Sequence, residues 1–142
     1  PDDLWDICWE LLRIGYELPR GWLAGGMRAW RQAGAEIEFM PQLSVHDLHR
    51  RLDGGRQMTV LDVRQPAEWA EGHIPAALHI TGAELPARLD EVPRQRLVAV
   101  ICGSGYRSSV AASLLKRHGH KEVVNVLGGM SGWSAAGYKV VT

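Results

Sequence analysis

A ten-residue segment occurs twice in this 142-residue chain, and the repeat sets the size of the folding unit. Residues 25–34 read Gly-Gly-Met-Arg-Ala-Trp-Arg-Gln-Ala-Gly, and residues 128–137 read Gly-Gly-Met-Ser-Gly-Trp-Ser-Ala-Ala-Gly, with six identities at an offset of 103. Because this offset is the size of a whole domain, it excludes a short-period solenoid. The repeat predicts a complete unit at 39–142 and the C-terminal remnant of a preceding, degenerate unit at 1–38.

Short apolar runs alternate with helical patterns along the chain. Residues 97–101 are five consecutive apolar residues, which predicts the most buried strand. Such alternation is typical of a three-layer α/β fold, in which a central, mostly parallel sheet is flanked by helices on both faces. The expected strands are 20–23, 58–63, 77–80, 97–101 and 123–126, and the expected helices are 3–14, 27–33, 44–52, 68–71, 81–89, 107–118 and 131–135.

Composition argues against several classes of partner and site. Sixteen basic and sixteen acidic residues give a net charge of zero, which offers no electrostatic footprint for nucleic acid or a membrane surface. No apolar run approaches the roughly 20 residues that cross a bilayer. Two cysteines 94 positions apart make neither a disulfide framework nor a zinc site, so we expect a cytoplasmic protein without metal or cofactor. Surface positions are expected for His46, His49, His118 and His120.

The segment Cys102-Gly-Ser-Gly-Tyr-Arg-Ser, which follows the expected central strand, carries the chemistry. In parallel sheets, sites form beyond the carboxyl ends of the strands. The N–H groups of a glycine-containing turn, a helix start and Arg107 all favour a thiolate, so we expect Cys102 to be nucleophilic with a lowered pKa. A buried, inert cysteine is the alternative, and the Gly-x-Arg pattern argues against it. Cys8, on the apolar face of helix 3–14, is expected in a core.

Four motifs in chain order resemble those of the rhodanese family, and together they cover nearly all of 39–142. Ala76 stands where the family usually has glycine, a turn position at which the change is expected to cost little. The motifs are Asp-Val-Arg at 62–64, Glu-Trp-x-x-Gly-His-Ile-Pro-Ala-Ala at 68–77, Cys-x-x-Gly-x-Arg-Ser at 102–108 and Gly-Gly-x-x-x-Trp at 128–133.

The resemblance implies sulfur transfer through a persulfide on Cys102. A sulfane sulfur would pass from thiosulfate or an organic persulfide to a thiol or cyanide, with Cys102 and Arg107 as the catalytic residues. The substrate-binding loop would comprise Gly103, Ser104, Gly105, Tyr106 and Ser108. Structural support would come from Asp62, Arg64, Glu68 and His73, with a catalytic role for Asp62 and Arg64 as the alternative.

Loop length separates two activities within this resemblance. Arg107 lies five residues after Cys102, as in rhodanese-type sulfurtransferases, whereas the related dual-specificity phosphatases have a loop one residue longer. A non-catalytic, regulatory rhodanese-like module is a third interpretation, although such modules usually lose the cysteine. Many members carry a basic residue directly after the cysteine, and Gly103 replaces it here, which predicts weak use of thiosulfate.

Residues 1–38 are expected to be degenerate, because the offset places Leu4 and Trp5 where the second copy has Arg107 and Ser108. The arrangement resembles the C-terminal part of fusions between a metallo-β-lactamase-fold domain and rhodanese domains, with an ordinary tandem rhodanese as the alternative. The sequence begins at Pro1 with neither an initiator methionine nor a signal-peptide pattern, so we expect a piece of a longer protein. The apolar side chains of 1–38 are expected to pack on their own domain or on a second chain, giving a homodimer.

Overall fold

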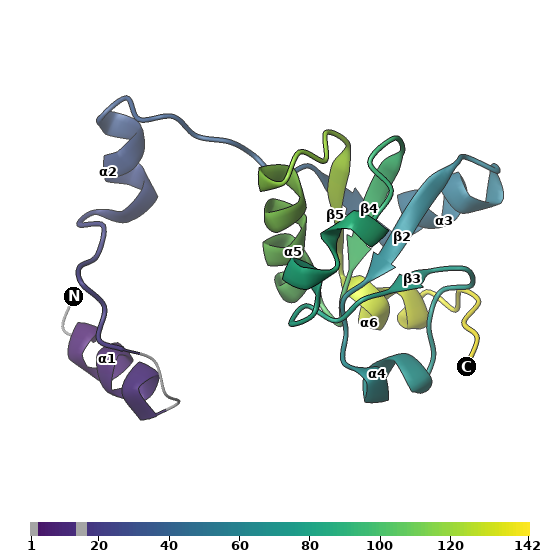
Figure 1. Cartoon of the computed structure of the whole chain (residues 1–142), viewed down its shortest axis with the longest axis horizontal. Helices are drawn as coiled ribbons and strands as arrows, with labels where there is room; N and C mark the ends of the chain where they lie inside the picture. The colour runs from purple at the N-terminus through teal and green to yellow at the C-terminus, as the bar shows by residue number, and fades with distance from the viewer. Residues whose placement is uncertain (1–2, 14–16) are drawn as a thin grey trace. The chain divides into compact units, whose positions relative to one another are not determined.

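The computed structural model describes residues 3–13 and 17–142 (Figure 1). Its contacts divide the chain into two compact units, Pro1–Glu38 and Phe39–Thr142. No helix among the described residues is long and apolar enough to span a membrane.

The second unit is built on a five-stranded sheet in the order β1-β5-β4-β2-β3, and each neighbouring pair is parallel. Strand β4 lies in the centre of this order, and its last four residues are fully buried, as the apolar run predicted. A central strand covered on both faces has no polar side, so an unbroken apolar run fits it. The strands are β1 Gln42–Ser44, β2 Met58–Asp62, β3 Leu78–His79, β4 Leu97–Ile101 and β5 Val123–Leu127.

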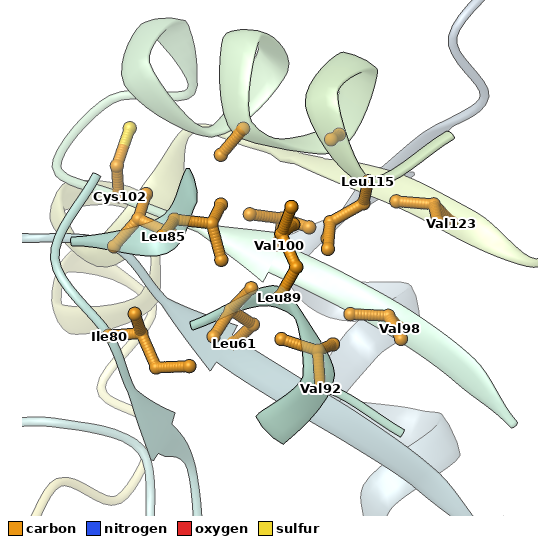
Figure 2. Close-up of a cluster of buried hydrophobic side chains, with 13 residues drawn as sticks. Leu61, Ile80, Leu85, Leu89, Val92, Val98, Val100, Cys102, Leu115 and Val123 are labelled. Atoms are coloured by element: carbon orange, nitrogen blue, oxygen red, sulfur yellow. The ribbon is translucent and has the colours of Figure 1, made fainter. Parts of the chain in front are cut away.

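Helices cover both faces of this sheet, which confirms the predicted three-layer α/β fold (Figure 1). Alternate residues of β4 enter two separate clusters, Val98 and Val100 on one face and Ala99 and Ile101 on the other. Figure 2 shows the first cluster, beneath α5 and with Cys102 at its edge. The helices of the second unit are α3 Val45–Asp53, α4 Pro66–Ala70, α5 Tyr106–Arg117 and α6 Gly129–Ala135, with two 3₁₀ turns, η1 Leu85–Ala87 and η2 Leu89–Glu91.

The structure differs from the sequence prediction in three elements. The helix expected at 81–89 is replaced by the two 3₁₀ turns, because Pro86 lacks an N–H and disfavours the helical conformation of the residue before it. Strand β1 was not predicted, since its three residues are too few to show a pattern. The strand expected at 20–23 is absent from the described residues, where no neighbouring strand satisfies its backbone groups.

The two copies of the repeated segment adopt the same backbone conformation. Helices α2, Gly26–Gln32, and α6 occupy the same seven positions at the offset of 103. Each follows a left-handed glycine, Gly25 with φ 76° and Gly128 with φ 80°. Trp30 and Trp133 each donate from Nε1 to the carbonyl six residues later, at 2.8 and 3.0 Å. This likeness supports a common origin for the two segments, while the assignment of 1–38 as a remnant stays a prediction.

The surroundings of the two copies differ. Trp133 is 2% exposed in a core cluster of the second unit, whereas Trp30 is 41% exposed. Helix α1, Leu4–Arg13, buries none of its residues, and Cys8 is only half-buried, so the expectation that Cys8 belongs to a core was wrong. Position 14, the expected end of this helix, lies outside the described residues.

Ala76 carries a backbone strain that a glycine would relieve. Its φ is +60°, and among the described residues no other non-glycine residue has a positive φ. We expect Ala76→Gly to raise the free energy of unfolding by about 0.5–1 kcal/mol, because a left-handed conformation costs an L-residue about 1–2 kcal/mol. Ala70→Gly, at an exposed position of α4, should instead lower it by about 1 kcal/mol. Urea denaturation of both variants measures the difference, and a destabilised Ala76→Gly would contradict the expectation.

Candidate active site

Cys102 lies directly after β4, in a loop that is held from behind by the start of α6. The N–H of Met130 donates to the Cys102 carbonyl at 2.7 Å, and the N–H of Ser131 donates to the Gly103 carbonyl at 3.0 Å. Gly105, with φ 111°, then turns the chain into α5. Because the carbonyls of Cys102 and Gly103 are bound to α6, the N–H groups of the following residues are available to the sulfur.

The Cys102 sulfur is surrounded by hydrogen-bond donors. Its Sγ accepts from the Gly105 N–H at 3.2 Å and lies 3.3 Å from the Ser108 hydroxyl, while the residue is 1% exposed. Burial raises the pKa of Cys102, but hydrogen bonds from the Ser108 hydroxyl and from the N–H groups of Ser108, Gly105 and Ser104 outweigh it. The pKa of this thiol therefore lies below its ordinary value. The side chain of Tyr106 is 79% exposed, so only its backbone belongs to the loop.

Arg107 is engaged by a carboxylate rather than free at the mouth of the loop. Its two terminal nitrogens donate to the two carboxylate oxygens of Glu68 at 2.7 and 2.8 Å. This pairing lowers the pKa of Glu68 to about 2, despite partial burial, and raises the pKa of Arg107. The pair therefore stays ionised at neutral and mildly acidic pH, and Glu68 compensates the positive charge of Arg107.

The buried pair of Asp62 and Arg64 ties the segment that carries Glu68 to the end of β2. Arg64 donates to the Asp62 carboxylate at 2.7 to 3.0 Å, and also to the carbonyls of Glu68 at 2.9 Å and Gly72 at 2.8 Å. Such charge-assisted bonds, out of reach of water, fix a loop rather than react. This geometry favours structural support over the catalytic alternative for Asp62 and Arg64.

His73 lies in the same supporting segment. Its ring Nδ1 is 3.2 Å from the Trp69 carbonyl, and its backbone exchanges two 2.9 Å hydrogen bonds with Val141. Its ring also stacks on Trp69, with the ring centroids 3.5 Å apart. These contacts are those of a residue that holds a turn in place.

The sequence analysis missed one buried polar residue, Asn125, and was wrong about another, His120. Asn125 in β5 is 3% exposed, and its Oδ1 accepts from the Ser108 hydroxyl at 2.6 Å. The signal for it was a single amide within the apolar run of residues 123–126. His120, expected at the surface, is 3% exposed with its ring nitrogens beside the carbonyls of Leu115 and Val92. Among the described residues, no cluster of histidine, cysteine and acidic side chains could hold a metal ion.

A family model, described as the rhodanese-like domain, matches residues 44–136. The chain belongs to the rhodanese-like family. A protein named sulfurtransferase from Allochromatium vinosum is 35% identical over 100 residues, which cover 70% of this chain and 94% of that protein. The putative sulfur carrier protein YrkF of Bacillus subtilis is 35% identical over 95 residues, 67% of this chain, and the match spans about half, 51%, of that relative.

Solved structures agree with this rhodanese-like assignment. The rhodanese-related protein of Thermoplasma volcanium superposes with a TM-score of 0.66 at 35% sequence identity, covering 71% of this chain and 97% of that one. A rhodanese-like domain protein of Staphylococcus aureus gives the same TM-score of 0.66 at 28% identity, covering 72% of this chain and all, 100%, of that one.

A cavity of about 300 Å³ opens beside the loop of this rhodanese-like domain. Its polar lining includes Arg64, Glu68, Glu71, Ser131 and Ser134, and Gly103 contributes backbone. The cavity is large enough for a small sulfur compound. Arg64 is paired with Asp62 and Glu68 with Arg107. Glu71 is left as the lining charge without an ion pair among the described residues, which makes the cavity unattractive to a dianion.

Proposed function

We propose that this protein is a rhodanese-type sulfurtransferase with Cys102 as its nucleophile. The Cys102 thiolate attacks the outer sulfur of a donor, so that a new S–S bond forms as the donor's own bond to that sulfur breaks. The leaving group departs as sulfite or as a thiolate with the electron pair of the broken bond. A thiol or cyanide acceptor then attacks the outer sulfur of the Cys102 persulfide and regenerates the thiolate.

The observation that carries this proposal is the convergence of donors on one buried sulfur. The N–H groups of Ser104 and Gly105, at the start of α5, favour an anion at Cys102 and would equally hold the outer sulfur of a persulfide. Relatives named sulfurtransferase or sulfur carrier support a sulfur-transfer role. Mass spectrometry of the protein after exposure to a sulfur donor tests the proposal. A non-catalytic module would acquire no sulfur on Cys102.

We further propose that the donor is an organic persulfide rather than thiosulfate. Thiosulfate carries two negative charges, and Arg107, the cation of the loop, is already paired with Glu68. An organic persulfide needs no second cation at its sulfur end. Its organic group could enter the cavity beside Gly103.

The carboxylate of Glu68 is the group to change in a test of this preference. Glu68→Gln should lower the KM for thiosulfate about tenfold, because removing one negative charge near the loop is worth roughly 1.4 kcal/mol. Glu122→Gln is the matched control, since Glu122 is an exposed carboxylate that neither lines this cavity nor pairs with Arg107. Steady-state kinetics with both donors measures the effect. An equal KM for thiosulfate in Glu68→Gln and the parent protein would contradict the proposal that the pairing of Glu68 with Arg107 weakens thiosulfate binding.

Residues 1–38 are proposed to mediate self-association. Their apolar side chains are largely exposed, including Trp5 at 72%, Trp9 at 59% and Trp22 at 66%. Exposed apolar area of this kind marks an interaction surface. Deleting residues 1–38 should convert a dimer into a monomer that still forms the Cys102 persulfide, because the sheet and loop lie within 39–142. Light scattering coupled to size exclusion decides the matter, and a monomeric full-length chain would rule the proposal out.

The wider setting of the chain also stays a proposal. The repeat supports the remnant of a degenerate rhodanese-like unit at 1–38. The proposal that the chain is the C-terminal part of a fusion with a metallo-β-lactamase-fold domain rests on the resemblance of this arrangement to such fusions. A cytoplasmic location is supported by the two free cysteines, Cys8 and Cys102. The length and domain content of the natural gene product test the proposed fusion. Fractionation of cells that express the protein tests the proposed location.

A further inference from the structure

A chain of hydrogen bonds, buried at Cys102 and exposed at Gln42, runs from the sulfur to the edge of the sheet. The Ser108 hydroxyl lies 3.3 Å from Cys102 Sγ and donates to Asn125 Oδ1 at 2.6 Å. Asn125 Nδ2 donates to Gln42 Oε1 at 2.8 Å, and Gln42 Nε2 donates to the Met40 carbonyl at 2.9 Å. Ser108 is 0% and Asn125 is 3% exposed, so water cannot replace the bond between these two side chains, whereas Gln42 is exposed.

The far end of this chain determines the direction of every bond in it. The Met40 carbonyl can only accept, which requires Gln42 to present its amino group there and its oxygen to Asn125. Asn125 must then donate to Gln42 and present its own oxygen to the Ser108 hydroxyl. The hydroxyl has a single hydrogen, which either Asn125 Oδ1 at 2.6 Å or Cys102 Sγ at 3.3 Å can accept. The shorter distance assigns it to Asn125 while Cys102 is a thiol, which leaves a lone pair of Ser108 facing Sγ.

We propose that Asn125 and Gln42 are positioning residues, which hold the Ser108 hydroxyl as an acceptor for the Cys102 thiol until the sulfur becomes anionic. This inference rests on the proposed function only in taking Cys102 as the nucleophile. When Cys102 loses its proton, the Ser108 hydroxyl turns and donates to Sγ instead of to Asn125 Oδ1. Formation of the thiolate therefore breaks one short hydrogen bond as it makes another.

The consequence is that Asn125 opposes the thiolate that the loop favours. Without Asn125 Oδ1 as a competing acceptor, the Ser108 hydroxyl can donate to the sulfur without giving up another hydrogen bond. Without the hydroxyl, that donation to the sulfur is abolished. The charged groups around the sulfur are Arg107, which interacts with Cys102 and pairs with Glu68, and the Asp62–Arg64 pair at the end of neighbouring strand β2. None of these side chains belongs to the hydrogen-bonded chain, so substitutions within it leave their charges in place.

The test is the pH dependence of Cys102 alkylation by iodoacetamide, in a Cys8→Ser background that leaves one thiol. Below the pKa, Ser108→Ala should lower the thiolate fraction about tenfold, the effect of losing a hydrogen bond to a charged group. Asn125→Ala should raise that fraction about threefold or more. In the double variant, Asn125→Ala should have no effect, because the hydroxyl through which it acts is gone.

Gln42→Ala, at the exposed edge of the sheet, keeps the test decisive if Asn125→Ala fails to fold. It should raise the thiolate fraction about twofold, since Asn125 is then no longer held in one orientation. Gln57→Ala is the matched control, an exposed glutamine outside the chain of bonds. Unchanged titration in Asn125→Ala, or in Gln42→Ala where Asn125→Ala does not fold, would overturn the proposal. An equal effect of Asn125→Ala with and without Ser108 would overturn it as well. Alkylation needs no sulfur donor, so the thiolate titration can be measured whether or not the protein transfers sulfur. A protein that forms no persulfide would contradict the proposed function and would leave the test of Asn125 and Gln42 unaffected.

Discussion

Cys102→Ser should abolish sulfur transfer, with a loss of at least about a thousandfold in kcat/KM for any donor. A serine hydroxyl in the same loop is not ionised by the hydrogen bonds that lower the pKa of the Cys102 thiol, and it forms no persulfide. The substitution is nearly isosteric, so the fold should be unchanged. Cyanide-dependent formation of thiocyanate measures the transfer.

Cys8→Ser is the matched control for this prediction. Cys8 is half-buried in α1, within a unit that contains none of the sheet strands. Its substitution should leave kcat and KM within about twofold of the parent values. Substantial transfer by Cys102→Ser, or its loss in Cys8→Ser, would place the reactive sulfur elsewhere.

Gly129→Ala should disrupt the reactive loop and destabilise the second unit by about 3 kcal/mol or more. Gly129 has φ 53°, and a Cβ built there would lie 2.3 Å from the Cys102 carbonyl oxygen and 2.5 Å from that of Gly103. Both contacts are with backbone, which cannot move aside without releasing the hydrogen bonds from α6. Persulfide formation should therefore fail together with stability.

The internal repeat supplies a control with the same local conformation. Gly26 occupies the equivalent position in α2, with φ 58°, and a Cβ there would meet nothing within 4 Å. Gly26→Ala should cost about 1 kcal/mol locally and leave urea unfolding of the second unit and persulfide formation unchanged. Equal effects of Gly129→Ala and Gly26→Ala would show that backbone strain, rather than the contact with the loop, limits this position.

The parts of the fold that sequence predicted well are those in which a local pattern reports burial. The central strand β4 was placed correctly because a run of five apolar residues is typical of a strand that is buried on both faces of the sheet in an α/β unit. Strand β1 could not be found, since its three residues owe their conformation to pairing with β5. The helix expected at 81–89 failed because the capping signal at Thr81 outweighed Pro86 in the prediction.

The candidate site likewise has one part that a local sequence pattern predicts and another part that only the fold brings together. Cys102 and its loop follow from a contiguous pattern, and the structure places Gly105 and Ser108 beside the sulfur as that pattern requires. The partners from distant segments could not be derived from spacing. Glu68 is 39 positions from Arg107, and Asn125 is 17 positions from Ser108. Only the fold of the parallel sheet brings these side chains together.

The most direct test of the proposed sulfur transfer is peptide-level mass spectrometry of the full-length protein after brief exposure to glutathione persulfide or to thiosulfate. We predict that the peptide containing Cys102 gains the mass of one sulfur atom with the organic persulfide, and gains far less with thiosulfate. Addition of a thiol acceptor should remove that mass. An unmodified Cys102 with both donors, or sulfur bound only to Cys8, would contradict the assignment of Cys102 as the sulfur-carrying residue.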